Sequence, residues 1–221
     1  MMDSVLLLTK FTHDAWAQSK DKYVSIIFLD IKATFPSMVV ETLIYNMRKR
    51  GIPREYTNWY QRRLEMCKAI PSFNDFQSEP FNIPIGLDQG CPLSPITFLF
   101  YNTDLIGLGG DCHNILTLRF INNTAFVARG KSVEVANKKL LELMNHPGGA
   151  LEWSASHQAE FEIDKTSLIH ATHNKSADPL CPGCLTPTKR PSITINGHHI
   201  KATTSCKFLG VFIDQELHFA T

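Results

Sequence analysis

The sequence has almost no net charge and no long apolar run. These two features limit the kinds of protein that the chain can be. Its 221 residues carry 22 lysines and arginines against 21 aspartates and glutamates, which gives a formal net charge of +1. Any surface for nucleic acid must therefore be local rather than spread over the molecule. No apolar run reaches the length of a membrane span, so we expect no membrane-embedded segment.

The N-terminus and the cysteines are typical of an intracellular protein. The opening residues MMDSVLLLTK lack the basic start and the apolar length of a signal peptide. The six cysteines are scattered along the chain, and we expect them to be reduced. A content of 43% hydrophobic and 19% charged residues is that of an ordinary globular domain.

The pattern of apolar residues predicts helices alternating with strands. The run YVSIIFLDI at 23–31 has no polar alternation, as in a strand buried on both faces. We expect helices at 3–20, 36–50, 54–66, 95–106 and from a Ser132 cap to 145, and strands or strand pairs at 68–85, 116–129, 161–171, 192–202 and 207–214. Residues 174–191, with four prolines, are interpreted as a linker. This order predicts an α+β fold with a mostly antiparallel sheet covered on one side by helices.

A local excess of basic residues lies between residues 48 and 68. It comprises Arg48, Lys49, Arg50, Arg54, Arg62, Arg63 and Lys68, against Glu55 and Glu65. Such a cluster suits contact with phosphates. Charge alone, however, favours the simpler interpretation of a solvated helix face.

Asp30 is an unusual end for a buried strand. A carboxylate is costly to desolvate unless it meets a cation or hydrogen-bond donors, so an acid at the end of a strand that opens onto a cleft is a candidate metal ligand. An alternative of equal weight is an N-cap-like acid that satisfies the amides of a turn.

The loop GLDQGCPLSP at 86–95 is a second candidate site. Gly86 and Gly90 allow close approach to the backbone, and Gln89 presents an amide between them. The alternative is a tight connection without a ligand, and the density of special residues favours a binding role.

These segments together resemble a known family. FLDIKATF at 28–35, GLDQGCPLSP at 86–95 and FINNTAFVA at 120–128 have the order and approximate spacing of three polymerase palm motifs. The chain closely resembles the reverse transcriptase domains of non-LTR, LINE-like retrotransposons, especially those of fungal genomes. The resemblance continues through 146–172 and 207–214, so five motifs in order support it where any one would be weak.

The resemblance implies an architecture, partners and a cofactor. It implies the palm of a right-hand polymerase with partial fingers over 1–173, a Pro-rich linker over 174–191, and a primer-grip-like hairpin and strand over 192–221. The implied partners are an RNA template and a DNA primer, the implied cofactor is Mg²⁺, and the family agrees with a nuclear location. The basic residues then expected to contact nucleic acid are Arg48, Lys49, Arg50, Arg62 and Arg63.

The family's first and fourth motifs assign roles to individual residues. The aspartate that holds both catalytic metal ions in the family matches Asp30, with the Ile31 carbonyl beside it. The aromatic residue that excludes a ribose 2′-OH matches Phe35. The lysine near the triphosphate matches Lys165.

The second motif matches with one departure. Gln89 and Gly90 correspond to the pair that lies beneath the template base and the incoming nucleotide. Many relatives have proline before this pair, and this chain has Asp88.

The third motif departs from the family where charge matters most. Active relatives carry two aspartates on this hairpin, and this chain has Asn122 and Asn123. An asparagine keeps the shape of an aspartate but loses the anionic oxygen through which Mg²⁺ is bound. Of three expected carboxylates only Asp30 remains, and the loss of two should lower catalysis by many orders of magnitude.

We therefore expect a degenerate reverse transcriptase domain with impaired polymerase activity. Two alternatives stay open, a non-catalytic remnant that binds nucleic acid and a structural remnant without a selected role. An Asn-Asn pair is also an ordinary turn signal in unrelated folds, which the flanking motifs disfavour. We also expect truncation, with the basic fingers segment before residue 5, a thumb beyond Thr221 and an endonuclease domain all missing.

The pair Cys181 and Cys184 is half of a zinc site by its spacing. Candidates to complete it are His170, His173, His198 and His199. We favour the interpretation that these are incidental cysteines of a linker.

Overall fold

The computed structural model describes residues 2–18, 20–32, 35–83, 86–88, 90–110, 112–177 and 185–219. The chain forms two compact units. Unit 1 comprises residues 1–31, 105–152 and 161–221, and unit 2 comprises residues 32–104 and 153–160. Among the described residues, none of the helices has both the length and the apolar character that a bilayer crossing demands.

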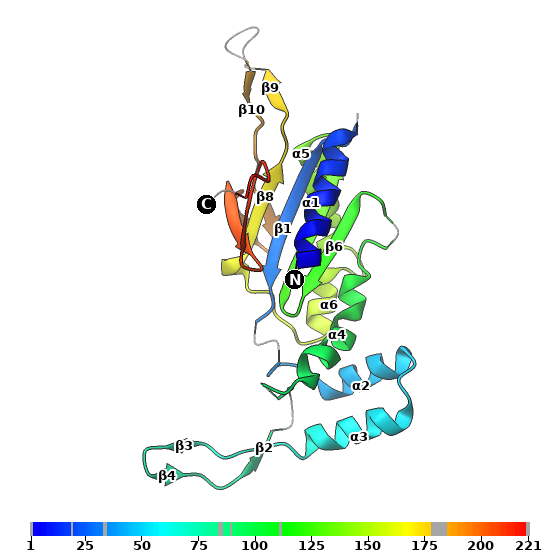
Figure 1. Ribbon diagram of the computed structural model, residues 1–221, viewed down its shortest axis with the longest axis vertical. Helices are drawn as coiled ribbons and strands as arrows, with labels where there is room; N and C mark the ends of the chain where they lie inside the picture. Colours follow the sequence, from blue (N-terminus) through cyan, green and yellow to red (C-terminus); the bar gives the residue numbers. More distant parts are fainter. Residues whose placement is uncertain are drawn as a thin grey trace. The chain divides into compact units, whose positions relative to one another are not determined.

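Within its described residues, unit 1 is built around a four-stranded antiparallel sheet in the order β6-β7-β1-β8 (Figure 1). The strands are β1 Tyr23–Asp30, β6 Ile115–Phe120, β7 Asn123–Gly130 and β8 Ser167–Ala171. All of β1 except its two end residues is buried, as expected of an apolar strand between two neighbours. Its register places Asp30 opposite Asn123, which brings the first and third motifs together.

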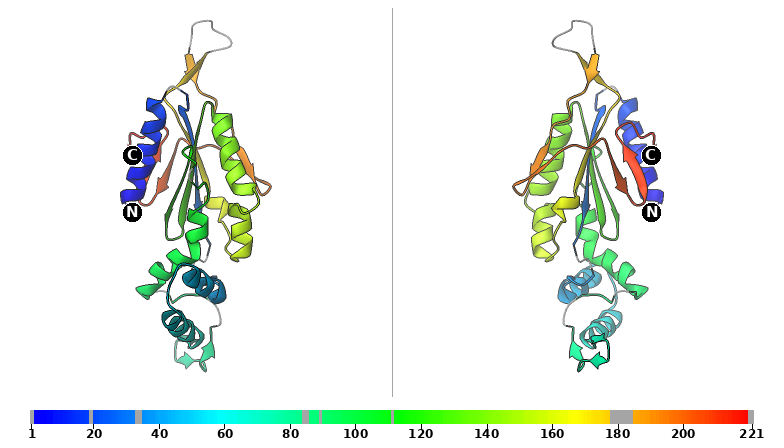
Figure 2. Two further views of the ribbon diagram at one scale, coloured as in Figure 1. Left: turned by 90° about the vertical axis from the view of Figure 1, so that its right-hand side faces the viewer. Right: turned by 90° about the vertical axis from the view of Figure 1, so that its left-hand side faces the viewer.

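Helices cover both faces of this sheet (Figure 2). Helix α1, Met2–Ala17, contacts β6 and β1, and helix α5, Val133–Asn145, contacts β7 and β1. The prediction that helices cover only one side of the sheet was wrong. Strand β1 is apolar on both faces, so each face of the sheet needs a helix packed against it. On the α1 side, Phe28 shares a core with Leu8 and Phe208.

Shorter elements complete unit 1. They are α6 Ala150–Ser156, which continues into unit 2, a 3-10 turn Ile163–Lys165, β9 Lys175–Ala177, β10 Leu185–Pro187, β11 Ile193–Ile195, β12 His198–Ile200, β13 Ser205–Phe208 and β14 Val211–Asp214. The Ser132 cap is confirmed, since its hydroxyl accepts the Val135 N–H. The hairpin around Asn196 and Gly197 is also confirmed.

Three expectations for the C-terminal half were wrong. Residues 161–164 form an isolated bridge and the start of a 3-10 turn rather than a strand, because the Thr166 N–H closes an i→i−3 bond to Ile163. The expected linker contains a strand pair, β9 with β10. The single strand that the residue pattern predicts at 207–214 is part of a hairpin, as in the primer-grip-like hairpin that the resemblance implies within 192–221, because Gly210 reverses the chain at φ +80° between β13 and β14.

Unit 2 consists of helices and short strand pairs. They are α2 Val40–Lys49, α3 Arg54–Glu65, β2 Lys68–Ala69, β3 Ser72–Phe73, β4 Phe76–Gln77, β5 Phe81–Asn82 and α4 Leu93–Ile106, whose last two residues belong to unit 1. The helix expected from Pro36 begins only at Val40. The carbonyls of Phe35 and Met38, which would open that helix, instead accept N–H groups from the loop that starts at Gly86.

Candidate active site

The first cluster of predicted site residues lies in unit 1, at the end of β1. Asp30 is the last residue of β1, and Asn123 is the first residue of β7, directly opposite. Asn122 belongs to the two-residue turn between β6 and β7, and its carbonyl accepts the Ile31 N–H at 3.2 Å. Pairing across β1 and β7 therefore places both amides beside the carboxylate, as the sequence predicts.

The turn before these amides holds a backbone conformation that is rare for its residue type. Ile121 has φ +55°, a left-handed conformation that a β-branched side chain seldom adopts. Two-residue hairpins need such a dihedral, and the Arg119 guanidinium, which donates to the Ile121 carbonyl at 3.1 Å, holds the turn in place. Burial lowers the pKa of Arg119 to about 9.

The side chains of the cluster form a chain of hydrogen bonds. The Asn122 amide donates to Oδ1 of Asp30 at 2.5 Å, and the Asn123 amide donates to Oδ1 of Asn122 at 3.0 Å. A pair of aspartates could not make this chain, because ionised carboxylates only accept hydrogen bonds. Asn122 thus acts as a donor toward the carboxylate that remains, and Asn123 supports Asn122 from behind.

Lys165 reaches the same carboxylate from the 3-10 turn. Its ammonium is 3.9 Å from Oδ2 of Asp30 and 2.7 Å from Oε2 of Glu162. The hydrogen bond and charge of Glu162, and then the charge of Asp30, raise the pKa of Lys165 above its usual range. The sequence predicted Lys165 but not Glu162, although an acid next to this turn in FEID at 161–164 was a usable signal.

A divalent metal ion does not fit these residues as they stand. Reverse transcriptases as a family use divalent metal ions, and such ions are bound through anionic oxygens. Asp30 offers the one carboxylate of the predicted set, with Oδ1 taken by an amide donor and Oδ2 facing an ammonium. In the described part of the chain, no group of three or more His, Cys, Asp or Glu side chains is arranged to hold a metal ion.

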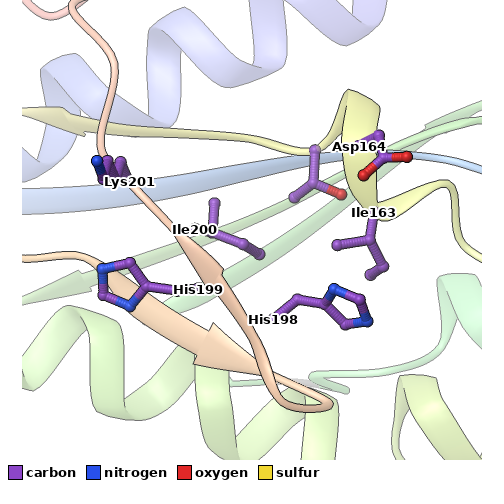
Figure 3. A pocket seen from close by; sticks show the side chains of 7 residues that line it. Ile163, Asp164, His198, His199, Ile200 and Lys201 are labelled. Atoms are coloured by element: carbon purple, nitrogen blue, oxygen red, sulfur yellow. The ribbon is translucent and has the colours of Figure 1, made fainter.

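A pocket of about 340 Å³ lies between the 3-10 turn and β12 (Figure 3). Figure 3 shows Asp164 and His198 at one end, with His199 and Lys201 toward the other. The polar groups of this pocket therefore do not converge on a single point. Lys165 is not among the lining residues, so the pocket is distinct from the Asp30 cluster.

The second cluster of predicted site residues lies in unit 2, where Phe35 meets the loop of residues 86–91. The Leu87 N–H donates to the Phe35 carbonyl at 2.8 Å. Gly86 has φ +95°, and a Cβ there would lie 2.9 Å from the Pro36 carbonyl oxygen. Only glycine allows this approach, so the close contact expected at Gly86 is made with the chain's own backbone.

Gly90 differs from Gly86 in its surroundings. It has φ +86°, and a Cβ built on it would meet no atom within 4 Å. Its backbone is therefore open to close approach by a ligand. Gln89, the other half of the predicted nucleotide-binding pair, lies outside the described residues.

The basic residues predicted to bind nucleic acid are less free than their spacing indicates. Their partners within unit 2 are Thr57 and Asn58 for Arg48, Asp104 for Lys49 and Arg50, and Asp88 for Arg63. Arg62 is exposed and takes part in no ion pair among the described residues. The cluster thus supplies less free positive charge than a count of residues suggests.

The candidate zinc ligands gain no support from the described residues. Cys181 and Cys184 lie outside them. Both ring nitrogens of His170 are engaged, Nδ1 with the Ser25 hydroxyl at 3.0 Å and Nε2 with the Pro191 carbonyl at 2.9 Å. The zinc alternative therefore stays a prediction.

Residues 3–213 match the family model described as reverse transcriptase (RNA-dependent DNA polymerase). The chain belongs to this family. The match spans both clusters of site residues, and it confirms the family predicted from the motifs.

Two curated relatives point to the same kind of element. The chain is 22% identical over 208 residues to the RNA-directed DNA polymerase from mobile element jockey of Drosophila melanogaster, and 23% identical over 217 residues to its counterpart of Drosophila funebris. Each alignment covers 92% of this chain and 21% of the relative. The chain thus spans about a fifth of the length of these relatives. The predicted non-LTR type is confirmed, and the fungal type stays a prediction.

Solved structures of telomerase share the fold. The chain resembles apo telomerase of Candida tropicalis, truncated from its C-terminal domain, with a TM-score of 0.64 and 15% identity over 99% of this chain and 39% of that one. A second structure of that telomerase, in complex with a TWJ fragment of telomeric RNA, has a TM-score of 0.64 and 14% identity over 99% of this chain and 32% of that one. The predicted α+β right-hand polymerase fold is confirmed.

Proposed function

We propose that this chain is a reverse transcriptase domain that still binds an RNA template with a DNA primer but has lost most of its nucleotidyl transfer activity. One observation carries the proposal. Asp30 meets the donor amide of Asn122 where an active site would present a second carboxylate. The chain keeps the polymerase fold but lacks the carboxylate charges at positions 122 and 123.

The charge argument follows from what phosphoryl transfer needs. Two divalent ions about 4 Å apart stabilise the attacking and the leaving oxygen, and anionic ligands hold those ions. For Mg²⁺, which keeps its water tightly, a neutral amide oxygen is a poor substitute. A loss of about 4 kcal/mol of transition-state stabilisation lowers a rate about a thousandfold, so two missing carboxylates suffice to silence the step.

Lys165 reinforces this effect. Its ammonium lies between the carboxylates of Asp30 and Glu162, and a positive charge there opposes an approaching metal ion. The same ammonium is well placed to attract a phosphate group, because its side chain is 62% exposed.

Nucleic-acid binding relies on the residues of unit 2. Arg62 is exposed, Gly90 is open to close approach, and Phe35 lies against the same loop. Within the described part of the chain, Arg48 bonds to the neutral side chains of Thr57 and Asn58, so its charge remains available to a phosphate. An RNA template and a DNA primer as ligands imply an intracellular setting.

The decisive experiment is primer extension on an RNA template with Mg²⁺ or Mn²⁺. We expect no product from the unaltered chain and a gain of product from the double variant Asn122→Asp with Asn123→Asp. Robust synthesis by the unaltered chain would overturn the proposal. A silent double variant would place a further defect elsewhere in the chain.

A non-catalytic binding protein is the second candidate, and the exposed Arg62 and the open backbone at Gly90 favour it over a structural remnant. It predicts measurable affinity for an RNA–DNA hybrid that falls steeply with salt, because phosphate contacts release counterions. If the chain bound the hybrid no more tightly than a neutral protein of similar size does, the binding candidate would be excluded and the structural remnant would remain.

A further inference from the structure

The loop of residues 86–91 is fastened at several of its described residues within unit 2. At its start, the Leu87 N–H donates to the Phe35 carbonyl at 2.8 Å. At its centre, the Ser94 hydroxyl donates to the Asp88 carbonyl at 2.7 Å. The side chain of Asp88 adds a third attachment, to helix α3.

That attachment is an ion pair with Arg63. Nη2 of Arg63 is 2.5 Å from Oδ2 of Asp88, and each side chain is 32% exposed. The Cys67 thiol donates to the other carboxylate oxygen at 3.2 Å, so both oxygens of Asp88 are engaged. Arg63 also donates to Sγ of Cys91 at 3.5 Å, which ties the far end of the loop to the same pair.

The electrostatics of the cluster agree with a stable pair. Burial by itself would lower the pKa of Arg63, but the hydrogen bond and charge of Asp88 outweigh it, and the pKa lies above its ordinary value. Burial, followed by the hydrogen bond and charge of Asp88, raises the pKa of Cys67. The thiol therefore stays protonated and remains a donor. A partly sheltered pair with such support is stronger than a fully exposed one.

We infer that Arg63 and Asp88 are positioning residues, which hold the loop so that the backbone at Gly90 stays accessible to a nucleic-acid strand. Gly90 is two residues from Asp88, in a left-handed conformation with open space beside it. Arg63 acts through Asp88, whereas its neighbour Arg62 is exposed and, on the proposed function, is the arginine that contacts phosphate. The identity of the ligand rests on the proposed function, and the fastening of the loop does not.

The two roles for Arg63 predict effects of opposite sign for Asp88→Asn. If Arg63 contacted phosphate, removal of Asp88 would release a cation and tighten binding. If the pair positions the loop, Asp88→Asn weakens binding, by about threefold to tenfold. The measurement is fluorescence anisotropy of the full chain with an RNA–DNA hybrid that carries an RNA overhang, repeated over a range of KCl concentrations.

The salt dependence gives a matched comparison of two neighbouring arginines. Arg62→Gln should reduce the slope of log affinity against log salt by about 0.9, the value for one phosphate contact. Arg63→Gln should lower affinity at every salt concentration and leave the slope unchanged. Equal losses of slope in both variants would contradict the inference.

A second measurement does not need nucleic acid. Alkylation of the full chain with a maleimide, followed by peptide mass spectrometry, reports the exposure of Cys67 and Cys91. Asp88→Asn should speed the labelling of both, Arg62→Gln should not, and the exposed Cys112 is the internal reference.

Unchanged labelling in Asp88→Asn, or tighter hybrid binding, would overturn the inference. If the unaltered chain bound no hybrid at all, the proposed function would fail while labelling would still decide whether the pair fastens the loop. Thermal unfolding of each variant separates a loosened loop from general instability.

Discussion

The amide of Asn122 donates a hydrogen bond of 2.5 Å to Oδ1 of Asp30. Two residues 92 positions apart thereby form a donor–acceptor pair at the place where the family carries two acids. The hydrogen bond gives one carboxylate oxygen of Asp30 a partner without a metal ion. Both carboxylate oxygens of Asp30 thus face side chains of the same chain, Asn122 at Oδ1 and Lys165 at Oδ2.

Replacing Asn122 with aspartate should destabilise unit 1. The change removes a donor and sets two carboxylates side by side, so we expect the free energy of unfolding at pH 7 to fall by about 1–2 kcal/mol. Added Mn²⁺ should recover the loss, because the new pair attracts a cation. Thermal unfolding with and without Mn²⁺ measures both effects.

The matched control for that variant is Asn196→Asp. Asn196 lies in the exposed turn between β11 and β12, where aspartate is equally compatible with the backbone. Its unfolding temperature should be insensitive to Mn²⁺. A similar Mn²⁺ response in both variants would show that the ion acts without the Asp30 cluster.

Gly86→Ala should lower stability more than Gly51→Ala does. Both glycines have positive φ, +95° and +84°, but a Cβ at Gly86 would lie within 3.0 Å of the Phe35 and Pro36 backbone, whereas Gly51 is open. We expect a cost of more than about 2 kcal/mol at Gly86 and about 1 kcal/mol at Gly51. Denaturant unfolding of the two variants gives the difference, and equal costs would show that the loop yields easily.

His170 should make stability depend on pH. Burial lowers its pKa in the folded chain, despite the Pro191 carbonyl and Glu134. The unfolded chain therefore binds a proton at higher pH than the folded chain, near the ordinary value of about 6.5. This contribution to stability is complete above that pH and is lost as the pH falls through it toward the lower folded value.

The test is the free energy of unfolding at pH 7.5 and pH 5.5. The unaltered chain should lose stability between these values, and His170→Asn should be less stable overall with a weaker pH dependence. His199→Asn, at an exposed position, should keep the dependence of the unaltered chain. The same dependence in His170→Asn would assign the effect to other groups.

Thiol reactivity should separate Cys112 from Cys206. Cys112 is exposed, whereas burial raises the pKa of Cys206 to about 12. Because the thiolate is the reactive form, a maleimide should label Cys112 quickly and Cys206 only after unfolding. Site-resolved mass spectrometry follows both, and rapid labelling of native Cys206 would mean that the β13–β14 hairpin opens readily.

The pattern of side chains was enough to predict the elements of the sheet. The strand at β1 followed from a run of apolar and β-branched residues, and the Ser132 cap and the turn at Asn196 and Gly197 followed from local chemistry. The start of α2 could not be predicted, because the carbonyls that would open the helix bond to a loop about fifty residues later. The residue pattern alone did not indicate the β13–β14 hairpin, because apolar residues stand on both sides of Gly210; the resemblance to the primer-grip-like hairpin did.

The sequence by itself determined the family and the missing charge, since motif order and the identity of Asn122 and Asn123 are properties of the chain alone. Only the tertiary structure decided which groups satisfy one another. Glu162 forms an ion pair with Lys165, and Asp88 forms one with Arg63. The physical reason is distance: Coulomb and hydrogen-bond energies depend on separations of a few ångströms, which residue spacing along the chain does not specify.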